Sequence, residues 1–139
     1  MDIAQFNAAH REPPTRRDAL EAIYSAAHWL LTEERVAEAA RVFRTLIQAD
    51  PADERGWLGL GQCHEHIDQP RIAAELFHAG SAVTRSPVRC LVARARILAR
   101  QGEQDSAEGL LDDAERAALE EGDHGLVELV ANERQAGSR

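Results

Sequence analysis

The pattern of apolar residues along the chain is that of helices. Valine, isoleucine and threonine occur, but no stretch alternates apolar and polar residues as a half-buried β-strand does. Alanine and leucine supply most of the apolar residues, and both favour helix. Near the C-terminus, Leu126, Val127, Leu129 and Val130 have the spacing of one apolar helix face. The pattern therefore predicts an all-α protein.

The pattern also repeats with a period of 34 residues. One set of equivalent positions holds small residues, and a second set, four residues further along, holds bulky ones. The two sets are Ala39, Ala73 and Ala107, and Phe43, Phe77 and Leu111. This period is typical of the tetratricopeptide repeat (TPR), a unit of two antiparallel helices. We therefore expect three tandem TPR helix hairpins in a superhelical α-solenoid, at about 20–53, 54–87 and 88–121.

The residue types at the repeated positions fit the packing of such hairpins. Counted from Leu20, Glu54 and Val88, positions 8 and 20 lie where the two helices of a hairpin approach, so only glycine or alanine fits. Position 8 holds Ala27, Gly61 and Ala95, and position 20 holds the three alanines. Bulky residues at positions 4, 7 and 24 are expected to fill the seam. Position 4 holds Ile23, Trp57 and Leu91, and position 7 holds Ala26, Leu60 and Arg94.

Helix breakers and caps set the expected boundaries. Pro51, Pro70 and Pro87 each fall at a proposed helix start or loop, where proline is tolerated. Gly102 falls in the third hairpin turn, at the offset that also relates Glu34 and Asp68.

The regions outside the repeats are short. Residues 1–14 are expected to form a helix over 3–10 and an arm, after which Thr15 or Asp18 caps the first repeat helix. The repeats then fill 15–122. Residues 123–139 are expected to form a capping helix, to about Glu133, and a frayed tail, since a solenoid otherwise exposes the apolar face of its last repeat.

The first helices of the hairpins are predicted to line a concave groove, through positions 2, 5, 9, 12 and 13 of each repeat. The predicted peptide-binding residues are Tyr24, His28, Leu31, Arg55, Leu58, Gln62, Glu65, Arg89, Val92, Arg96 and Arg100. The apolar members offer pockets for the anchors of an extended segment. The arginines offer bonds to its carbonyls or acidic side chains.

Charge is divided unevenly in the third repeat. Residues 85–100 contain five arginines and no acid, whereas 101–123 contain nine acids and only Arg116. One interpretation is that these charges solvate opposite helices of one hairpin and pair locally. The other is a binding face, because Arg89, Arg96 and Arg100 are spaced along one side of a helix.

Composition narrows the classes of partner. The formal net charge of −8 argues against nucleic acid and against an anionic membrane surface. The N-terminus has no signal-peptide core, and no stretch approaches a membrane span. The two cysteines, Cys63 and Cys90, are too few for a disulfide framework. We expect reduced thiols in a cytosolic protein.

A metal site and catalysis are disfavoured. In Cys63-His64-Glu65-His66, adjacent helical residues point apart, so only Cys63 and His66 come near each other. No second ligand cluster follows at zinc-site spacing. Neither cysteine lies in a signature of a nucleophile, and Gly59 and Gly61 lack the lysine of a phosphate loop. We therefore expect a binding protein that is not an enzyme and has no cofactor or metal, with both glycines serving packing.

Several segments resemble the TPR chaperones (class II) of type III secretion translocator proteins. Leu58 to Cys63 is similar to the family's F-x-G-L-G-A-C segment, and Arg41 to Leu46 to its K-V-F-x-x-L. Ala22 to Ala27 is similar to its first repeat, where a tyrosine faces the groove. Pro87 matches its displaced proline after repeat 2. The resemblance runs from about Ala19 to Ala118, roughly 70% of the chain.

The resemblance implies a cytosolic bacterial chaperone, linked to virulence, that binds an extended segment of a translocator subunit in its groove. It also implies a homodimer through the helix ahead of the first repeat. A generic TPR scaffold, which assembles a complex unrelated to secretion, stays open as the alternative. A clamp for acidic C-terminal tails fits poorly, since only Arg89 matches its required residues among Tyr24, His28, Gly59, Arg89 and Ala93.

Overall fold

The protein is a stack of helix pairs in which each pair contacts the next. The computed structural model describes residues 2–5 and 12–137. Beyond a helical stretch at residues 3–5, the described residues form seven α-helices and no strand. The helices are α2 (Arg16–Thr32), α3 (Val36–Ala49), α4 (Glu54–His66), α5 (Pro70–Val83), α6 (Val88–Arg100), α7 (Gln104–Glu121) and α8 (His124–Gly137).

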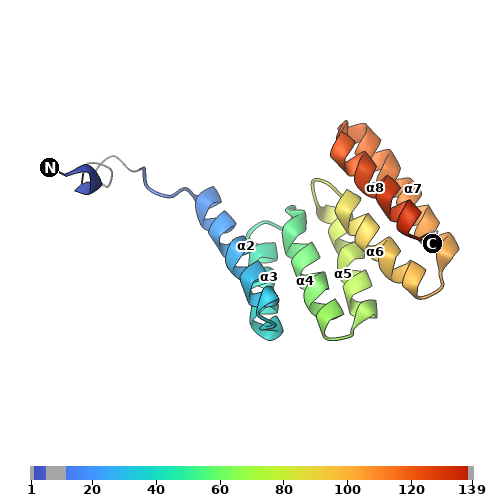
Figure 1. The fold of residues 1–139 in the computed structure, drawn as a ribbon, viewed down its shortest axis with the longest axis horizontal. Helices are drawn as coiled ribbons and strands as arrows, with labels where there is room; N and C mark the ends of the chain where they lie inside the picture. Colours follow the sequence, from blue (N-terminus) through green and yellow to red (C-terminus); the bar gives the residue numbers. More distant parts are fainter. Residues whose placement is uncertain (1, 6–11, 138–139) are drawn as a thin grey trace.

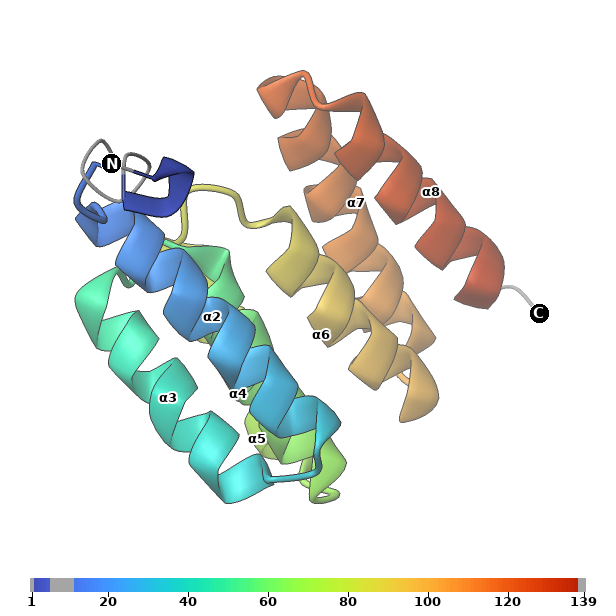
Figure 2. The same ribbon diagram turned by 60° about the vertical axis from the view of Figure 1, so that its left-hand side comes forward.

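The helices pair as α2–α3, α4–α5 and α6–α7, and the three hairpins follow one another along the long axis of the molecule (Figure 1). Helices α2, α4 and α6, which we call the A helices, pack in series, because α4 contacts both α2 and α6. Helix α8 lies against α6 and α7 at the C-terminal end (Figure 2). The predicted all-α solenoid of three TPR hairpins is confirmed, and its architecture is that of the solved structures described below.

The small positions of the repeat are where the helices touch. All three alanines at position 20 are at most 3% exposed, and Ala27 and Ala95 at position 8 at most 1%. Glycine is needed at two points of α4. A Cβ on Gly59 would lie 2.1 Å from the ring of Phe43, and a Cβ on Gly61 would lie 2.2 Å from the ring of Phe77. Both are therefore packing glycines, as expected.

The hairpin turns share one backbone conformation. Glu34, Asp68 and Gly102, the three residues related by the repeat offset, have positive φ angles of 61°, 58° and 83°. Glycine adopts this left-handed region without steric cost, whereas other residues do so at some cost. The same turn is thus made three times, from three different residue types.

Helix ends follow the sequence signals. Thr15 caps α2 by accepting from the Asp18 backbone N–H, and Asp18 accepts from the Thr15 backbone N–H, which makes a capping box. Pro70 occupies the first turn of α5, and Pro87 is the N-cap residue of α6. Gly122 ends α7 with a φ of 68°. Of the predicted N-terminal helix over 3–10, only residues 3–5 are described, and they are helical; the rest lies outside the described residues.

One packing prediction is wrong for α2. Ile23, at position 4, was expected to fill the seam but is 38% exposed, and Ala26 at position 7 is also exposed. The reason is that α2 begins the solenoid, so no earlier hairpin covers this side of it. In repeat 3, position 7 holds Arg94, which is half-buried and bonds its Nη1 to the His78 ring.

Candidate functional site: the A-helix face

The eleven predicted binding residues lie on the A helices, and we call their surface the A-helix face. Its exposed members are polar: His28, Gln62, Arg89, Arg96 and Arg100. Leu58, Arg55 and Glu65 are half-buried. The remaining three, Tyr24, Leu31 and Val92, are between 2% and 7% exposed and belong to the core. Leu58 is therefore the apolar member that this face offers to solvent.

Tyr24 lies beneath Arg55. The Arg55 guanidinium carbon is 4.1 Å from the Tyr24 ring centroid, a cation–π contact. Two carboxylates hold this guanidinium in place, Glu21 at 2.8 Å and Asp53 at 2.7 Å. Tyr24 is 4% exposed and its hydroxyl has no hydrogen-bond partner, and burial raises its pKa to about 12. The Arg55 guanidinium thus covers the Tyr24 ring at the repeat 1 end of the A-helix face.

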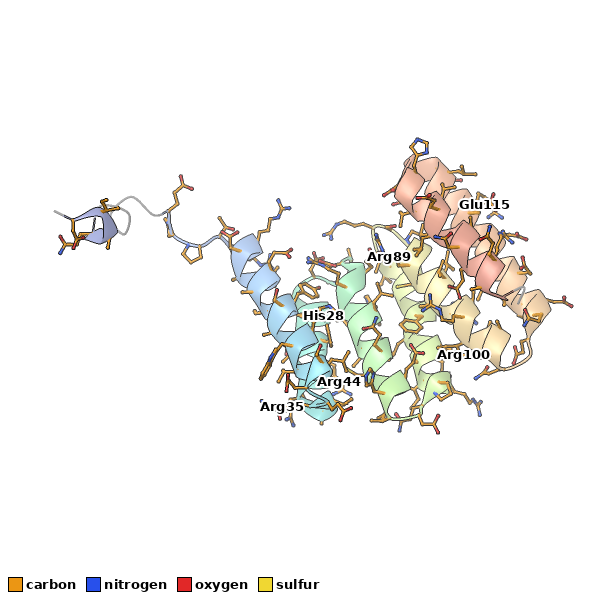
Figure 3. All side chains as sticks on the ribbon, viewed as in Figure 1. His28, Arg35, Arg44, Arg89, Arg100 and Glu115 are labelled. Atoms are coloured by element: carbon orange, nitrogen blue, oxygen red, sulfur yellow. The ribbon has the colours of Figure 1, made fainter. Side chains whose placement is uncertain are left out.

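The arginines of repeat 3 pair with carboxylates of neighbouring repeats. Arg89 bonds Glu54 of α4 at 2.6 Å, and Arg100 bonds Glu65 of α4 at 2.8 Å. Their positions in the stack are seen in Figure 3. Arg96 bonds Glu133 of α8 through both Nε and Nη2. Neither of the two interpretations of these charges anticipated this, because the partners lie across hairpins and not on α7.

These pairs leave hydrogen-bonding capacity on the surface. Arg89 and Arg100 keep side-chain exposures of 50% and 61%, and each uses a single Nη for its carboxylate. Exposed ion pairs of this kind contribute little to stability, about 0–1 kcal/mol each. Their larger effect is to hold the guanidinium groups in place, with donors free to meet a carbonyl or carboxylate.

The acidic partners were missed by the sequence reasoning, although a signal for them exists. The pairs Glu21–Arg55 and Glu65–Arg100 join residues 34 and 35 apart, and Asp50–Arg85 joins residues 35 apart. Opposite charges at the repeat period predict contacts between equivalent positions of adjacent hairpins. Searching the period for charge as well as for size would have found them.

At the C-terminal end, α8 is held to α7 by a charge cluster. The Arg134 guanidinium bonds Asp112 at 2.7 Å, Glu115 at 3.0 Å, and Glu108. Glu115 is labelled in Figure 3. Together with buried Leu126 and Val130, these contacts cover the last hairpin.

The Cys63–His66 segment does not converge on one point. The His64 ring lies 2.7 Å from Gln69 Oε1, Glu65 bonds Arg100, and the His66 ring lies 3.1 Å from the Gln62 carbonyl oxygen. Cys63 is buried and faces the core. Over residues 2–5 and 12–137, no three potential ligands cluster as a metal site.

Known proteins resemble this chain in sequence and in fold. No family profile matches it. The low calcium response locus protein H of Yersinia pestis, and its counterpart of Yersinia pseudotuberculosis, are 31% identical to it over 91 residues. The match covers 66% of this chain and 54% of each relative, so the chain spans about half the length of the curated relatives it matches.

Solved structures match over more of the chain. The type III secretion translocator chaperone SycD of Yersinia enterocolitica is 25% identical, with 99% of this chain and 97% of that chain covered and a TM-score of 0.76. The chain is therefore similar, in sequence and in fold, to the TPR-containing translocator chaperones of type III secretion.

Two further solved structures resemble the chain. SycD solved with a peptide of the translocator YopD is 26% identical, with 84% of this chain and 95% of that chain covered and a TM-score of 0.62. PcrH of Pseudomonas aeruginosa shares the fold, at 21% identity and a TM-score of 0.71 over 90% of this chain and 96% of that chain. In the part of the chain that the structure describes, no helix is long and apolar enough to cross a membrane.

Proposed function

We propose that this chain is a cytoplasmic secretion chaperone that binds an extended segment of a type III translocator subunit on its A-helix face. Binding keeps the segment soluble and competent for export. One observation carries the proposal: a 26%-identical relative with a TM-score of 0.62 is solved with a translocator peptide. The protein acts by binding and not by catalysis, in keeping with its structural similarity to the chaperone SycD.

The chemistry of the face suits an extended segment. Leu58 provides an apolar contact midway along the A helices, and burying one apolar anchor there contributes about 1.5–3 kcal/mol. Arg89 and Arg100, one on each end of α6, provide donors for carbonyls or carboxylates. An extended chain leaves its backbone groups free to accept these bonds, whereas a helix uses them internally.

The proposed binding site is tested by introducing a charged side chain on the A-helix face. Leu58→Glu should abolish co-purification with the translocator of the native host while leaving the helical circular dichroism intact. Ile72→Glu makes the same change at an exposed residue of α5, away from the A helices, and should leave co-purification unchanged. Retained binding by the Leu58 variant would refute the A-helix face as the site. If the proteins that co-purify with the wild-type chain include no translocator, the generic TPR scaffold would be favoured.

We also propose a homodimer, with contacts from the first helix of the solenoid and the helix predicted ahead of it. Trp29 is 54% exposed, whereas the equivalent residues of repeats 2 and 3, Cys63 and Ile97, are 1% exposed beneath the preceding hairpin. A second copy would cover this side of α2, including Ile23. Deleting residues 1–12 and replacing Trp29 with Glu should each lower the mass measured in solution towards that of one chain. An unchanged mass would exclude this interface.

A further inference from the structure

A hollow of about 390 Å³ lies between α3 and α4, apart from the A-helix face. Its lining consists of Val36, Ala37, Ala40, Arg41, Arg44, Cys63, His64 and Ile67. His64 follows Gln62 of the A-helix face by two residues, which is about 200° around a helix. The hollow therefore opens on a different side of α4 from the predicted cargo site.

The hollow combines an apolar floor with an apolar rim. Cys63 and Ala40 are 1% and 8% exposed and form part of its floor. Ile67, just beyond the end of α4, is 50% exposed at the same hollow. One bulky apolar side chain would fit in such a space and would bury the exposed part of Ile67.

Two unpaired cations stand beside it. Arg41 and Arg44 lie one helical turn apart on α3, and neither guanidinium makes an ion pair or hydrogen bond with a described residue. Arg44 is labelled in Figure 3. This contrasts with eight other arginines of the described chain, which pair with carboxylates. Although the chain has a net charge of −8, two free guanidinium groups beside an apolar hollow favour an acidic ligand over a basic one at this point.

We propose that the α3–α4 hollow is a second binding site, for a short acidic segment of a protein partner. The segment carries one bulky apolar side chain, which enters the hollow, and carboxylates within a turn of it, which meet Arg41 and Arg44. A protein segment fits better than nucleic acid or a lipid headgroup, because the lining offers an apolar pocket and only two cations. This site is independent of the A-helix face and of the proposed chaperone function.

The probe is a fluorescent twelve-residue peptide, long enough for about three helical turns, with a central leucine flanked by glutamates. Its counterpart has lysine in place of each glutamate. Fluorescence anisotropy at physiological ionic strength should show binding of the acidic peptide and none of the lysine peptide. The double variant Arg41→Glu, Arg44→Glu should weaken binding at least tenfold. Arg71→Glu, at an exposed arginine of α5 outside the hollow, should change it less than twofold.

Filling the hollow provides a second test that leaves charge unchanged. Ala37 is exposed and lines the hollow, so Ala37→Leu should weaken acidic-peptide binding at least fivefold without lowering thermal stability. Equal binding by both peptides, or no loss in either variant, would overturn the proposal. So would amide shift changes that gather on the A-helix face when the acidic peptide is added. Translocator binding should be retained in all three variants, and its loss would show one continuous site and not two.

Discussion

Gly59 of α4 lies directly against the ring of Phe43 of α3, so that a Cβ on residue 59 would sit 2.1 Å from Phe43 Cε1. Two residues later, Gly61 makes the same approach to Phe77 of α5, at 2.2 Å. Helix α4 is thus held between two phenylalanine rings, one from the preceding hairpin and one from its own. Both rings are at most 1% exposed, so neither has room to move aside.

Replacing Gly59 with alanine should therefore destabilise the protein. Overpacking of a well-packed core costs about 1–3 kcal/mol and exceeds the gain in helix propensity of up to about 1 kcal/mol. We expect the free energy of unfolding in urea to fall by about 2 kcal/mol. Gly109→Ala is the matched control, because Gly109 is helical and a Cβ there meets open space. That change should raise the unfolding free energy, by up to about 1 kcal/mol. A Gly59 variant as stable as this control would contradict the ring contact.

The positive-φ turns predict a substitution that stabilises. Glu34 is exposed and has a φ of 61°, a conformation that costs a non-glycine residue about 1–2 kcal/mol. Glu34→Gly should raise the free energy of unfolding by about 0.5 kcal/mol, since the relief is partly offset by the greater backbone entropy of glycine. Gly102→Ala should lower it by about 1 kcal/mol. Glu33→Gly, next to the turn at a φ of −80°, should not stabilise. A gain in that control equal to the gain at Glu34 would argue against strain in the turn.

Tyr24 predicts an alkaline limit to stability. Because burial raises the pKa of its phenol from 10.0 to about 12, the folded protein prefers the neutral form. Its contribution to stability is complete below pH 10, and is lost as the pH rises towards about 12. Tyr24 is the only tyrosine of the chain, so the change in near-ultraviolet absorbance that accompanies phenol ionisation reports it alone. The midpoint of this absorbance change should lie near pH 10 in urea and well above pH 10 in the native protein. Equal midpoints would show that Tyr24 is not buried.

The two thiols should be inert in the native state. Burial raises the pKa of Cys63 to about 11 and that of Cys90 to about 12, so little thiolate forms at neutral pH. A chromogenic disulfide reagent should react with neither cysteine in buffer and with both in urea. Gly59→Ala, which lowers the free energy of unfolding, should accelerate the native reaction because the core opens more often. Rapid reaction of the wild-type protein would contradict the burial of both side chains.

The repeat period predicts most of the fold, because small residues at a fixed spacing mark the positions where two helices pack closely. Ala39, Ala73 and Ala107 were enough to set the register, and every one of them is buried. What the period could not predict is the effect of the chain ends. Ile23 and Trp29 occupy core positions of the repeat but lie on a hairpin that has no predecessor.

The sequence predicts where the A-helix face lies, but not which of its side chains are exposed or which neighbours cover them. Register put Tyr24 and Val92 on the A helices, yet it carries no information on which neighbour covers a side chain. The cover over Tyr24 is Arg55, one repeat away, which carboxylates on both sides hold in place. Long side chains reach beyond their own position, so their partners have to be sought at the repeat distance. The selection of binding residues on this face stays a prediction.

Contacts between the described helices join each helix only to the next one or two along the chain. Nothing among them ties α2 to α8, so no closing contact fixes the distance between the two ends of the stack. The bend of the stack is therefore the sum of the small angles between adjacent hairpins. A segment bound along all three A helices would contact every hairpin at once. It would hold the angles between adjacent hairpins fixed. A displacement of the first hairpin would then change the position of the last one.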